Sequence, residues 1–445
     1  MTDLQIYITL GIFAAVILAI AFDVLDMAVA TVLGATVLYA FGILNSHDIE
    51  AAVDTSGGTL ALLFGGMVVA RTLTGTGLFE RIGNGLLQAT GGSGKRFLLL
   101  LIAMVAPVCA FLPNATTVIL LAPIIIRVAV AMEIDFVGPI VLTAIISNSA
   151  GLLTLVGDPA TFLVGSSIGM SFVTYLKRVS IGGLFCLLAI VPLLPMVMSD
   201  IWRLRCPLPP AERPKPIERP WFALLAIATL LCMVALFLVG EYLPQPIVPP
   251  TAAIIGAALS LLLVYSTRIE PVDNVLRDID WKTLVFLFSI FCLVQGVTRT
   301  GLLQGLALKL EVWFGTDLTL VALVLLGGVG LLSSLLANIP VVAASLLMTK
   351  GYLVATELVP EAALAAGFSD WPHAVIPVFI AMMFGATLGG NATLIGASAN
   401  VAGAGICAAH GKRISFLRFA RYGVPITACQ LIIAMLYVFA LSRFG

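Results

Sequence analysis

The sequence predicts an all-α polytopic membrane protein of about ten transmembrane helices plus two re-entrant hairpins, in two inverted-topology repeats with broken helices at the midplane. Three observations predict this class. Of the 445 residues, 60% are hydrophobic and only 10% are charged, far from the composition of a soluble domain. Two long apolar runs are interrupted by matching segments of glycine and polar residues. The two halves of the chain also align with each other.

Ten apolar runs are long enough to cross the hydrocarbon core, which takes about 20 residues. They begin near residues 5, 24, 59, 136, 179, 221, 247, 282, 373 and 422. Two further stretches, 98–130 and 318–350, are too long for one span and carry Asn and Pro halfway. Because Pro interrupts helical hydrogen bonding and both residues form turns, we interpret these stretches as re-entrant hairpins. Two ordinary spans joined by a tight turn are the alternative.

An internal repeat relates the two halves. Sliding the chain by 224 positions superposes Asn114 on Asn338, and the spans near 24 and 247 on each other. After an insertion in the second half, Thr154 pairs with Thr393. Each half then has five spans and one hairpin. An odd number of crossings makes the second half enter the membrane from the opposite face, and this symmetry predicts transport by alternating access.

The repeat sets the predicted domain boundaries. Residues 1–199 form the first repeat and residues 221–445 the second, joined by a Pro- and Arg-rich linker at 200–220. The broken helices are expected at 136–168 and 373–405.

Basic residues predict the orientation, because short cytoplasmic loops are enriched in Lys and Arg. Most basic residues of the loops lie on the side of the linker. The few on the other side are Lys177, Arg178, Lys309, Lys350 and Arg443. The linker side is therefore predicted to be cytoplasmic and both termini to be outside. The first hairpin would open towards the cytoplasm and the second outward.

The two breaks point to a function. The first contains Gly157, Asp158 and Pro159, and the second contains Gly396 and Ala397 at the matching positions. A helix that unwinds at membrane depth leaves amide and carbonyl groups that protein, water or a passing solute must satisfy. Such breaks line the solute sites of secondary transporters. The sequence therefore predicts a transporter whose site lies at the breaks.

These segments resemble a known family. The resemblance is carried by Ser-Asn-Ser-Ala-Gly at 147–151, Gly-Asp-Pro at 157–159 and the run 388–400. Through these motifs the chain resembles the ArsB and NhaD permeases of the ion transporter superfamily over nearly its whole length. That group includes arsenite and antimonite efflux permeases, sodium/proton antiporters, P-protein type permeases and plant silicon effluxers. Citrate and dicarboxylate carriers are more distant relatives. The resemblance implies secondary transport and leaves the substrate open.

The resemblance also implies site residues. In the carboxylate carriers the hairpin tips bear Ser-Asn-Thr triplets that hold sodium and substrate. The matching tips here lack the leading Ser, so Asn114, Thr116 and Asn338 are carried over as candidates, but sodium coordination by two full triplets is not. Alternatively, these side chains satisfy hairpin backbone in a dry interior.

Other polar residues at the tips and breaks complete the predicted site, because hydroxyl and amide groups can bind an oxygen-rich solute. The predicted substrate-binding residues are Asn114, Thr116, Thr117, Asn148, Thr154, Asn338, Asn391, Thr393, Ser398 and Asn400.

Asp158 and Arg71 are the predicted proton-coupling residues. A carboxylate at membrane depth is costly unless it is neutralised or paired, which favours reversible protonation of Asp158. Alternatively, Asp158 caps the half-helix that follows it. Arg71 lies inside the span from 59 to 79, where it can pair with Asp158, attract an anion or extend to the interface.

The leading hypothesis is an arsenite or antimonite efflux permease that exchanges its solute for protons. Trivalent arsenic in neutral water is mostly the uncharged trihydroxide, which needs hydroxyl and amide partners, and we see no cluster of midplane cations that would favour a dicarboxylate. The alternatives are a sodium/proton antiporter using the same Asp158 and a carrier of another neutral or anionic oxo-species such as silicic acid. An anion channel on the same scaffold is a further alternative.

The sequence offers no sign of an enzyme, a cofactor or a nucleic-acid site. The seven cysteines are scattered singly, without metal-ligand spacing, and no ATP-binding loop is present. The expected partners are the lipid bilayer, the small inorganic solute and protons. Family analogy adds a homodimer and a separate soluble ATPase subunit. We expect a multi-pass protein of the bacterial inner membrane.

Overall fold

The computed structural model describes residues 3–21, 24–76, 85–86, 88–206, 219–364, 368 and 370–444. Within these residues, ten helices are long and apolar enough to cross a membrane, and no strand is formed. The predicted fold class is confirmed. Most of the predicted linker at 200–220 lies outside the described residues.

The helices of the first half occupy the following ranges: α1 (Asp3–Ala21), α2 (Met27–Ala40), α3 (Ser46–Thr74), α5 (Gly94–Cys109), α6 (Asn114–Ala131), α7 (Val137–Ala150), a 3-10 turn (Gly151–Leu153), α8 (Pro159–Ser167), α9 (Phe172–Tyr175), a π-helical turn (Leu176–Ser180), α10 (Ile181–Leu188), α11 (Ile190–Val197) and α12 (Ser199–Trp202).

The second half contains α13 (Pro220–Val239), a 3-10 turn (Gly240–Tyr242), α14 (Pro249–Thr267), α15 (Val272–Arg277), α16 (Trp281–Arg299), α17 (Leu302–Phe314), α18 (Leu318–Leu335), α19 (Asn338–Ala355), 3-10 turns (Glu361–Leu364 and His373–Val375), α20 (Ile376–Gly389), α21 (Ser398–Ala409) and α22 (Phe416–Phe444).

The ten membrane-length helices are not the ten predicted spans. Runs predicted to begin near residues 24, 136 and 373 form the shorter helices α2, α7 and α20. Three arms of the predicted hairpins, α6, α18 and α19, are instead long enough to span by length and composition. For α7 and α20 the difference arises because each broken helix is divided into two pieces that are too short to cross about 30 Å of hydrocarbon alone. Helix α2 is a single helix that ends at Ala40 after 14 residues.

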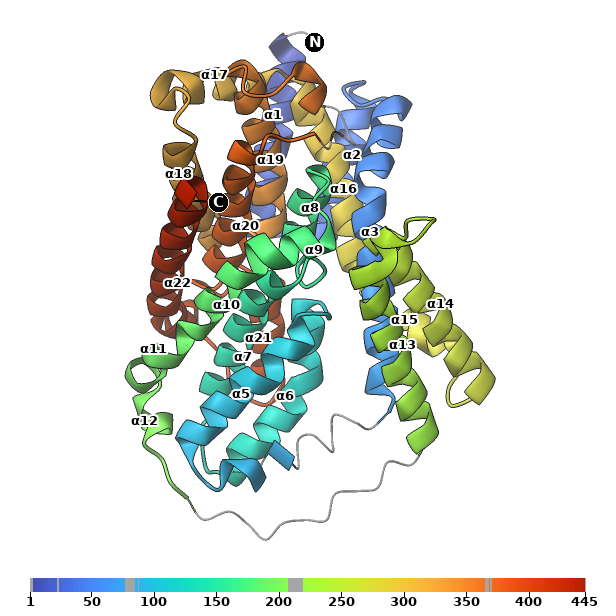
Figure 1. Cartoon of the computed structure of the whole chain (residues 1–445), viewed down its shortest axis with the longest axis vertical. Helices are drawn as coiled ribbons and strands as arrows, with labels where there is room; N and C mark the ends of the chain where they lie inside the picture. Colours follow the sequence, from blue (N-terminus) through green and yellow to red (C-terminus); the bar gives the residue numbers. More distant parts are fainter. Residues whose placement is uncertain are drawn as a thin grey trace.

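The hairpin tips lie at the predicted turns. Pro113 occupies the N-cap position of α6, and α6 then begins at Asn114. In the second half only Leu336 and Ala337 separate α18 from α19. Figure 1 shows α5 and α6 at the lower end of the molecule, whereas α18 and α19 lie in its upper half. The two hairpins therefore approach the middle from opposite ends.

The helices form two groups that lie side by side (Figure 1). The scaffold group contains α1, α2, α3, α13, α14 and α16, which pack closely against one another. The site group contains both hairpins, both broken helices and α22, which also pack closely together. Contacts between the groups are sparse and are made mainly by α3 with α8 and by α16 with α19.

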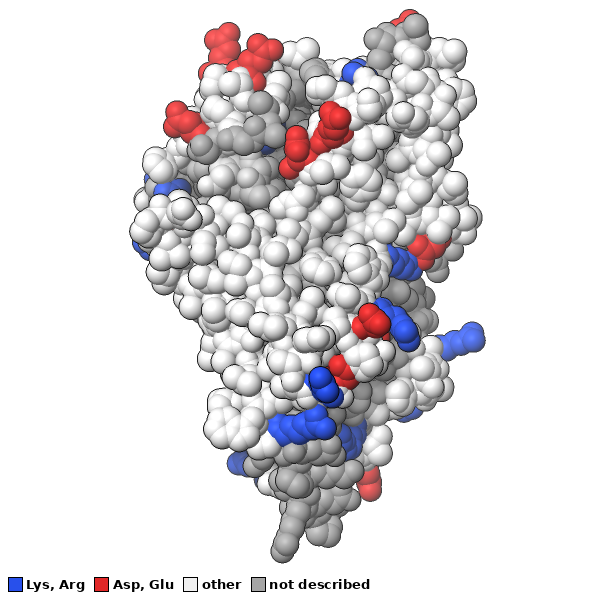
Figure 2. All heavy atoms as spheres, turned by 90° about the vertical axis from the view of Figure 1, so that its right-hand side faces the viewer, with Lys and Arg blue, Asp and Glu red and all other residues white. Residues whose placement is uncertain are grey.

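Acidic and basic residues are placed differently along the long axis of the molecule. On the face shown in Figure 2, most Lys and Arg lie in the lower half, several Asp and Glu lie at the upper end, and a broad area between them carries few charges. Such an area suits the hydrocarbon core of a bilayer. The basic lower end agrees with the predicted cytoplasmic side.

Small residues let α18 and α20 approach closely. A Cβ built on Gly385 would lie 3.2 Å from the backbone nitrogen of Gly330, and one on Gly389 would collide with the Gly330 carbonyl. Such close contacts between helix backbones are typical of glycine-rich membrane helix pairs. They place the C-terminal end of α20, and with it the second break, against the second hairpin.

We expect Gly389→Ala to destabilise the protein by about 1–3 kcal/mol, because the added methyl group must push α20 away from α18. The thermal unfolding midpoint of the purified protein would measure this. Gly328→Ala on α18 is the matched control, since its Cβ meets nothing within 4 Å. Equal midpoints for the two variants would contradict the proposed close packing.

Candidate functional site

Four helices begin near the middle of the site group. Helices α6 and α19 begin at the hairpin tips, and α8 and α21 begin after the two breaks. The segments 154–158 and 390–397 are non-helical, which confirms both predicted breaks. A helix N-terminus carries a partial positive charge and unpaired amides, so this arrangement favours an oxygen-rich or anionic solute.

Asp158 lies where the two repeats meet. Its side chain accepts hydrogen bonds from Thr387 Oγ1 at 2.9 Å and from Asn338 Nδ2 at 3.4 Å, both in the second repeat. Asp158 is only 2% exposed. It occupies the N-cap position of α8, and both of its side-chain partners named above belong to the second repeat. Among the described residues, no Lys or Arg forms an ion pair with it.

Asn114 fastens the first hairpin tip to the first broken helix. Its carbonyl oxygen accepts a hydrogen bond from Ser147 Oγ at 2.9 Å. With its amide oriented to satisfy its surroundings, Nδ2 donates to the carbonyls of Gly157 at 3.2 Å and Ser147 at 3.1 Å. The Asn114 side chain therefore supplies the contact between tip and break.

The same backbone contact occurs in both repeats. Thr154 Oγ1 donates to the Ala110 carbonyl, and Thr393 Oγ1 donates to the Ser334 carbonyl. Ala110 and Ser334 are separated by the repeat offset of 224 positions. Thr154 and Thr393 thus make equivalent contacts in the two repeats. Each hydroxyl donates its hydrogen bond to the hairpin backbone and is not available to donate to a solute.

Glycine is required where each break meets its hairpin. A Cβ on Gly157 would lie 2.9 Å from the Gly151 carbonyl oxygen and 3.0 Å from that of Cys109. A Cβ on Gly396 would lie 2.6 Å from the equivalent oxygen of Gly390 and 3.0 Å from that of Ser333. Any larger residue would separate the break from the tip.

Asn148, Asn391 and Asn400 lie together in a buried network with Ser149 and Gln430. Asn148 Nδ2 donates to Oδ1 of Asn391 (3.1 Å) and of Asn400 (3.0 Å). Asn391 Nδ2 donates to Ser149 Oγ and Gln430 Oε1, and Asn400 Nδ2 donates to the carbonyls of Gly390 and Thr393. Every amide nitrogen of the three asparagines is therefore already bonded. In this conformation they hold the second break, and their nitrogens are not free to bind a solute.

The remaining predicted residues are more open or more distant. Thr116 is half-buried and Thr117 is buried in the first turn of α6. Ser398, the first residue of α21, is exposed. None of the three forms a hydrogen bond with the Asp158 cluster. Asp158, Thr387 and Asn338, with the nearby tip residue Asn114, therefore form the centre of the candidate site.

The suggested pairing of Arg71 with Asp158 is wrong in this structure. Arg71 Nη2 lies 2.8 Å from Glu270 Oε2, and Nε lies 2.6 Å from Asp278 Oδ2. Arg71 is in the last turn of α3, and these acids flank α15 at the same end of the scaffold group. The alternative that Arg71 extends towards the interface agrees with this geometry.

Sequence reasoning missed Thr387, Ser149 and Gln430. Gln430 is completely buried in α22, and its Nε2 donates to Ser149 Oγ and to the Cys186 carbonyl. An isolated Gln in an apolar span is itself a signal, because an amide inside the membrane needs partners. Thr387 gives little signal, since a Thr can bond its own helix backbone.

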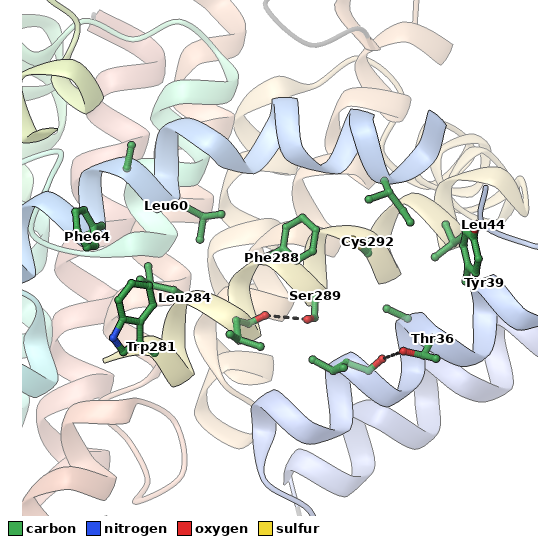
Figure 3. A pocket seen from close by; sticks show the side chains of 15 residues that line it. Thr36, Tyr39, Leu44, Leu60, Phe64, Trp281, Leu284, Phe288, Ser289 and Cys292 are labelled. Carbon is green, nitrogen blue, oxygen red and sulfur yellow. Dashed lines mark hydrogen bonds between the residues drawn. The ribbon is translucent and has the colours of Figure 1, made fainter. Parts of the chain in front are cut away.

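A large cavity elsewhere is apolar. It has a volume of about 720 Å³ between α2, α3 and α16 and is lined by residues such as Tyr39, Phe64 and Phe288 (Figure 3). The hydroxyls of Thr36 and Ser289 are bonded to the Val32 and Val285 carbonyls of their own helices. This lining suits hydrocarbon and not a polar solute, so we keep the candidate site at Asp158.

Comparisons with known proteins agree with a transporter. The family profile described as citrate transporter (CitMHS) matches residues 17–368. The uncharacterized transporter slr0753 of Synechocystis is 43% identical over 98% of this chain and 97% of its own length. The uncharacterized transporter Rv2684 of Mycobacterium tuberculosis is 30% identical over 97% of each chain.

A solved structure shares the fold. The YdaH transporter of Alcanivorax borkumensis, whose topology is described as unusual, superposes with a TM-score of 0.58 at 12% identity, covering 89% of this chain and 88% of that one. The narrower similarity to ArsB and NhaD permeases stays a prediction. With its broken helices, its long apolar spans and the profile match over most of its length, this chain belongs to the citrate transporter (CitMHS) family of multi-pass membrane transporters.

Proposed function

We propose that this transporter is a secondary active exchanger that exports a small oxygen-rich solute from the cytoplasm in return for protons. Asp158 carries the proton, and the solute binds beside it between the hairpin tips and the breaks. The leading substrate is the neutral trihydroxide of arsenite or antimonite.

One observation carries this proposal: the buried carboxylate of Asp158 accepts hydrogen bonds from neutral donors, Thr387 and Asn338 among them, and no described Lys or Arg forms an ion pair with it. A charged group in a dry interior is costly without a neutralising partner. A proton supplies that neutralisation reversibly. A sodium ion bound by the same oxygens supplies it too, and this keeps the sodium/proton antiporter as the rival mechanism.

The substrate follows from the chemistry around Asp158. The groups beside it are amides, hydroxyls and helix N-termini, and no Lys or Arg among the described residues bonds with Asp158, Asn114 or Asn338. Such groups suit a neutral hydroxide. Citrate is the second candidate, because the family description names it and because helix N-termini favour carboxylates.

Alternating access requires one part of the protein to move against another. The sparse contacts between the scaffold group and the site group support this, because few packed side chains must separate. We also propose that the protein lies in the bacterial inner membrane with both termini outside, in agreement with the basic lower end (Figure 2).

We expect Asp158→Asn to abolish arsenite accumulation in inside-out proteoliposomes driven by an imposed proton gradient. Asn is close in shape and can keep bonds with Thr387 and Asn338, but it cannot release a proton. The arsenite accumulated in the proteoliposomes is measured by radioactivity or by mass spectrometry. Asp273→Asn on exposed α15 is the matched control and should transport like the native protein. Undiminished proton-driven uptake by Asp158→Asn would reject Asp158 as the proton carrier.

Electrical measurements should identify the exchanged species. One proton exchanged for a neutral trihydroxide moves one charge, worth ~2.3 kcal/mol per 100 mV, so a potassium diffusion potential should drive uptake. Sodium exchanged one for one with a proton is electrically silent. Sodium-dependent proton flux without arsenite movement would favour the antiporter, and citrate-coupled proton flux without arsenite movement would favour the second candidate.

A further inference from the structure

A second charged group lies away from Asp158, at the other end of α8. Lys350 on α19 is only 6% exposed, and its Nζ donates to the Ser167 carbonyl at 3.2 Å. The ammonium also lies 5.4 Å from the centroid of the Trp371 ring. No described carboxylate forms an ion pair with it.

The Ser167 bond accounts for one of the three N–H donors of the ammonium. Cation–π contact with Trp371 stabilises the charge but takes up no hydrogen bond. A buried cation without an anionic partner is costly. The remaining donors therefore call for an anion or for water.

Lys350 lines a cavity of about 750 Å³ between the two helix groups. The walls come from α3 and α16 of the scaffold group and from α8 and α19 of the site group. Other polar residues that line it include Ser166, Ser171, Gln295 and Thr298. Gln295 is half-buried and forms no hydrogen bond among the described residues, so its amide is also available.

Two acids share this cavity without neutralising Lys350. Glu241 accepts a hydrogen bond from the Phe172 amide at 3.4 Å, and Asp54 is exposed near the start of α3. Neither lies within ion-pair distance of Lys350. The ammonium thus remains the cation available to a ligand in this part of the described cavity.

We propose that Lys350 and Gln295 form an oxyanion-binding site in this cavity, separate from Asp158, that takes a carboxylate or a comparable oxyanion such as phosphate. The ammonium supplies the charge, and the Gln295 amide supplies a directed donor from α16. Because the two residues belong to different helix groups, a bound anion links the scaffold group to the site group.

Trp371 provides a direct readout of binding. The full chain in nanodiscs is titrated with citrate, and in parallel with inorganic phosphate, at constant ionic strength while tryptophan emission is recorded. We expect a saturable change that disappears in Trp371→Phe, because Trp371 is the ring beside Lys350. The other four tryptophans keep the remaining emission measurable in that variant. A preference for citrate or for phosphate distinguishes the two sources of the oxyanion.

Lys350→Gln should weaken binding at least about tenfold, because it removes the buried positive charge that would pair with the bound anion. Lys350→Arg keeps the charge and should bind within severalfold of the native protein. Lys309→Gln on α17 removes an exposed lysine and is the matched control. Absence of saturable binding in the native protein, or equal binding by native and Lys350→Gln, would overturn the proposal.

Lys350 also donates a hydrogen bond to the last residue of α8, so its replacement can destabilise the fold. The thermal unfolding midpoint of each variant is therefore measured beside its binding. If Lys350→Gln does not fold, binding is measured with Gln295→Leu instead. Weaker citrate or phosphate binding by Gln295→Leu supports the site, and binding equal to that of the native protein rejects it. Asp158→Asn should keep the emission change. Failure of this proposal is therefore distinguishable from failure of proton coupling at Asp158.

Discussion

The site depends on one steric constraint, the contact of each helix break with the backbone of its neighbouring hairpin. At Gly157 and Gly396 a side chain would enter the space already taken by carbonyl oxygens of the hairpin and of the broken helix itself. Glycine removes that conflict, and Thr154 and Thr393 then bond to the hairpin backbone. Four helix starts are thereby held in the middle of one compact group. These backbone contacts between breaks and hairpins set the directions of the site side chains.

The two repeats share these backbone contacts but differ in the side chains at the breaks. The first break carries the acid Asp158, whereas the second has Ala397 at the matching position. The second break is instead held by the amide network around Asn391 and Gln430. In the proposed mechanism only the first break carries a titrating group, whereas the second is held by hydrogen bonds between amides. A symmetric backbone with an asymmetric charge is a simple way to couple movement to one ion.

Much of this architecture could be predicted from the sequence, because glycine, proline and buried polar residues interrupt apolar runs at both breaks and both tips. Asp158 was identifiable for the same reason. The partners of Asp158 and Arg71 could not be found this way. Glu270 and Asp278 are 199 and 207 positions from Arg71. Thr387 lies 229 positions from Asp158 in a helix buried on every side. Periodicity cannot specify which faces meet over such separations.

The shortness of α8 has an electrical consequence. Its nine residues rise by roughly 14 Å, about half of the hydrocarbon thickness. With α8 spanning one half of the bilayer, as the proposed mechanism requires, Asp158 at its inner end would lie near the middle of the voltage drop. A proton reaching it from either face crosses only part of the field, worth roughly half of the ~2.3 kcal/mol per 100 mV for a full crossing. Under the proposed proton coupling, occupancy of Asp158 by a proton would respond to the resting potential as well as to the acidity on the side that it faces.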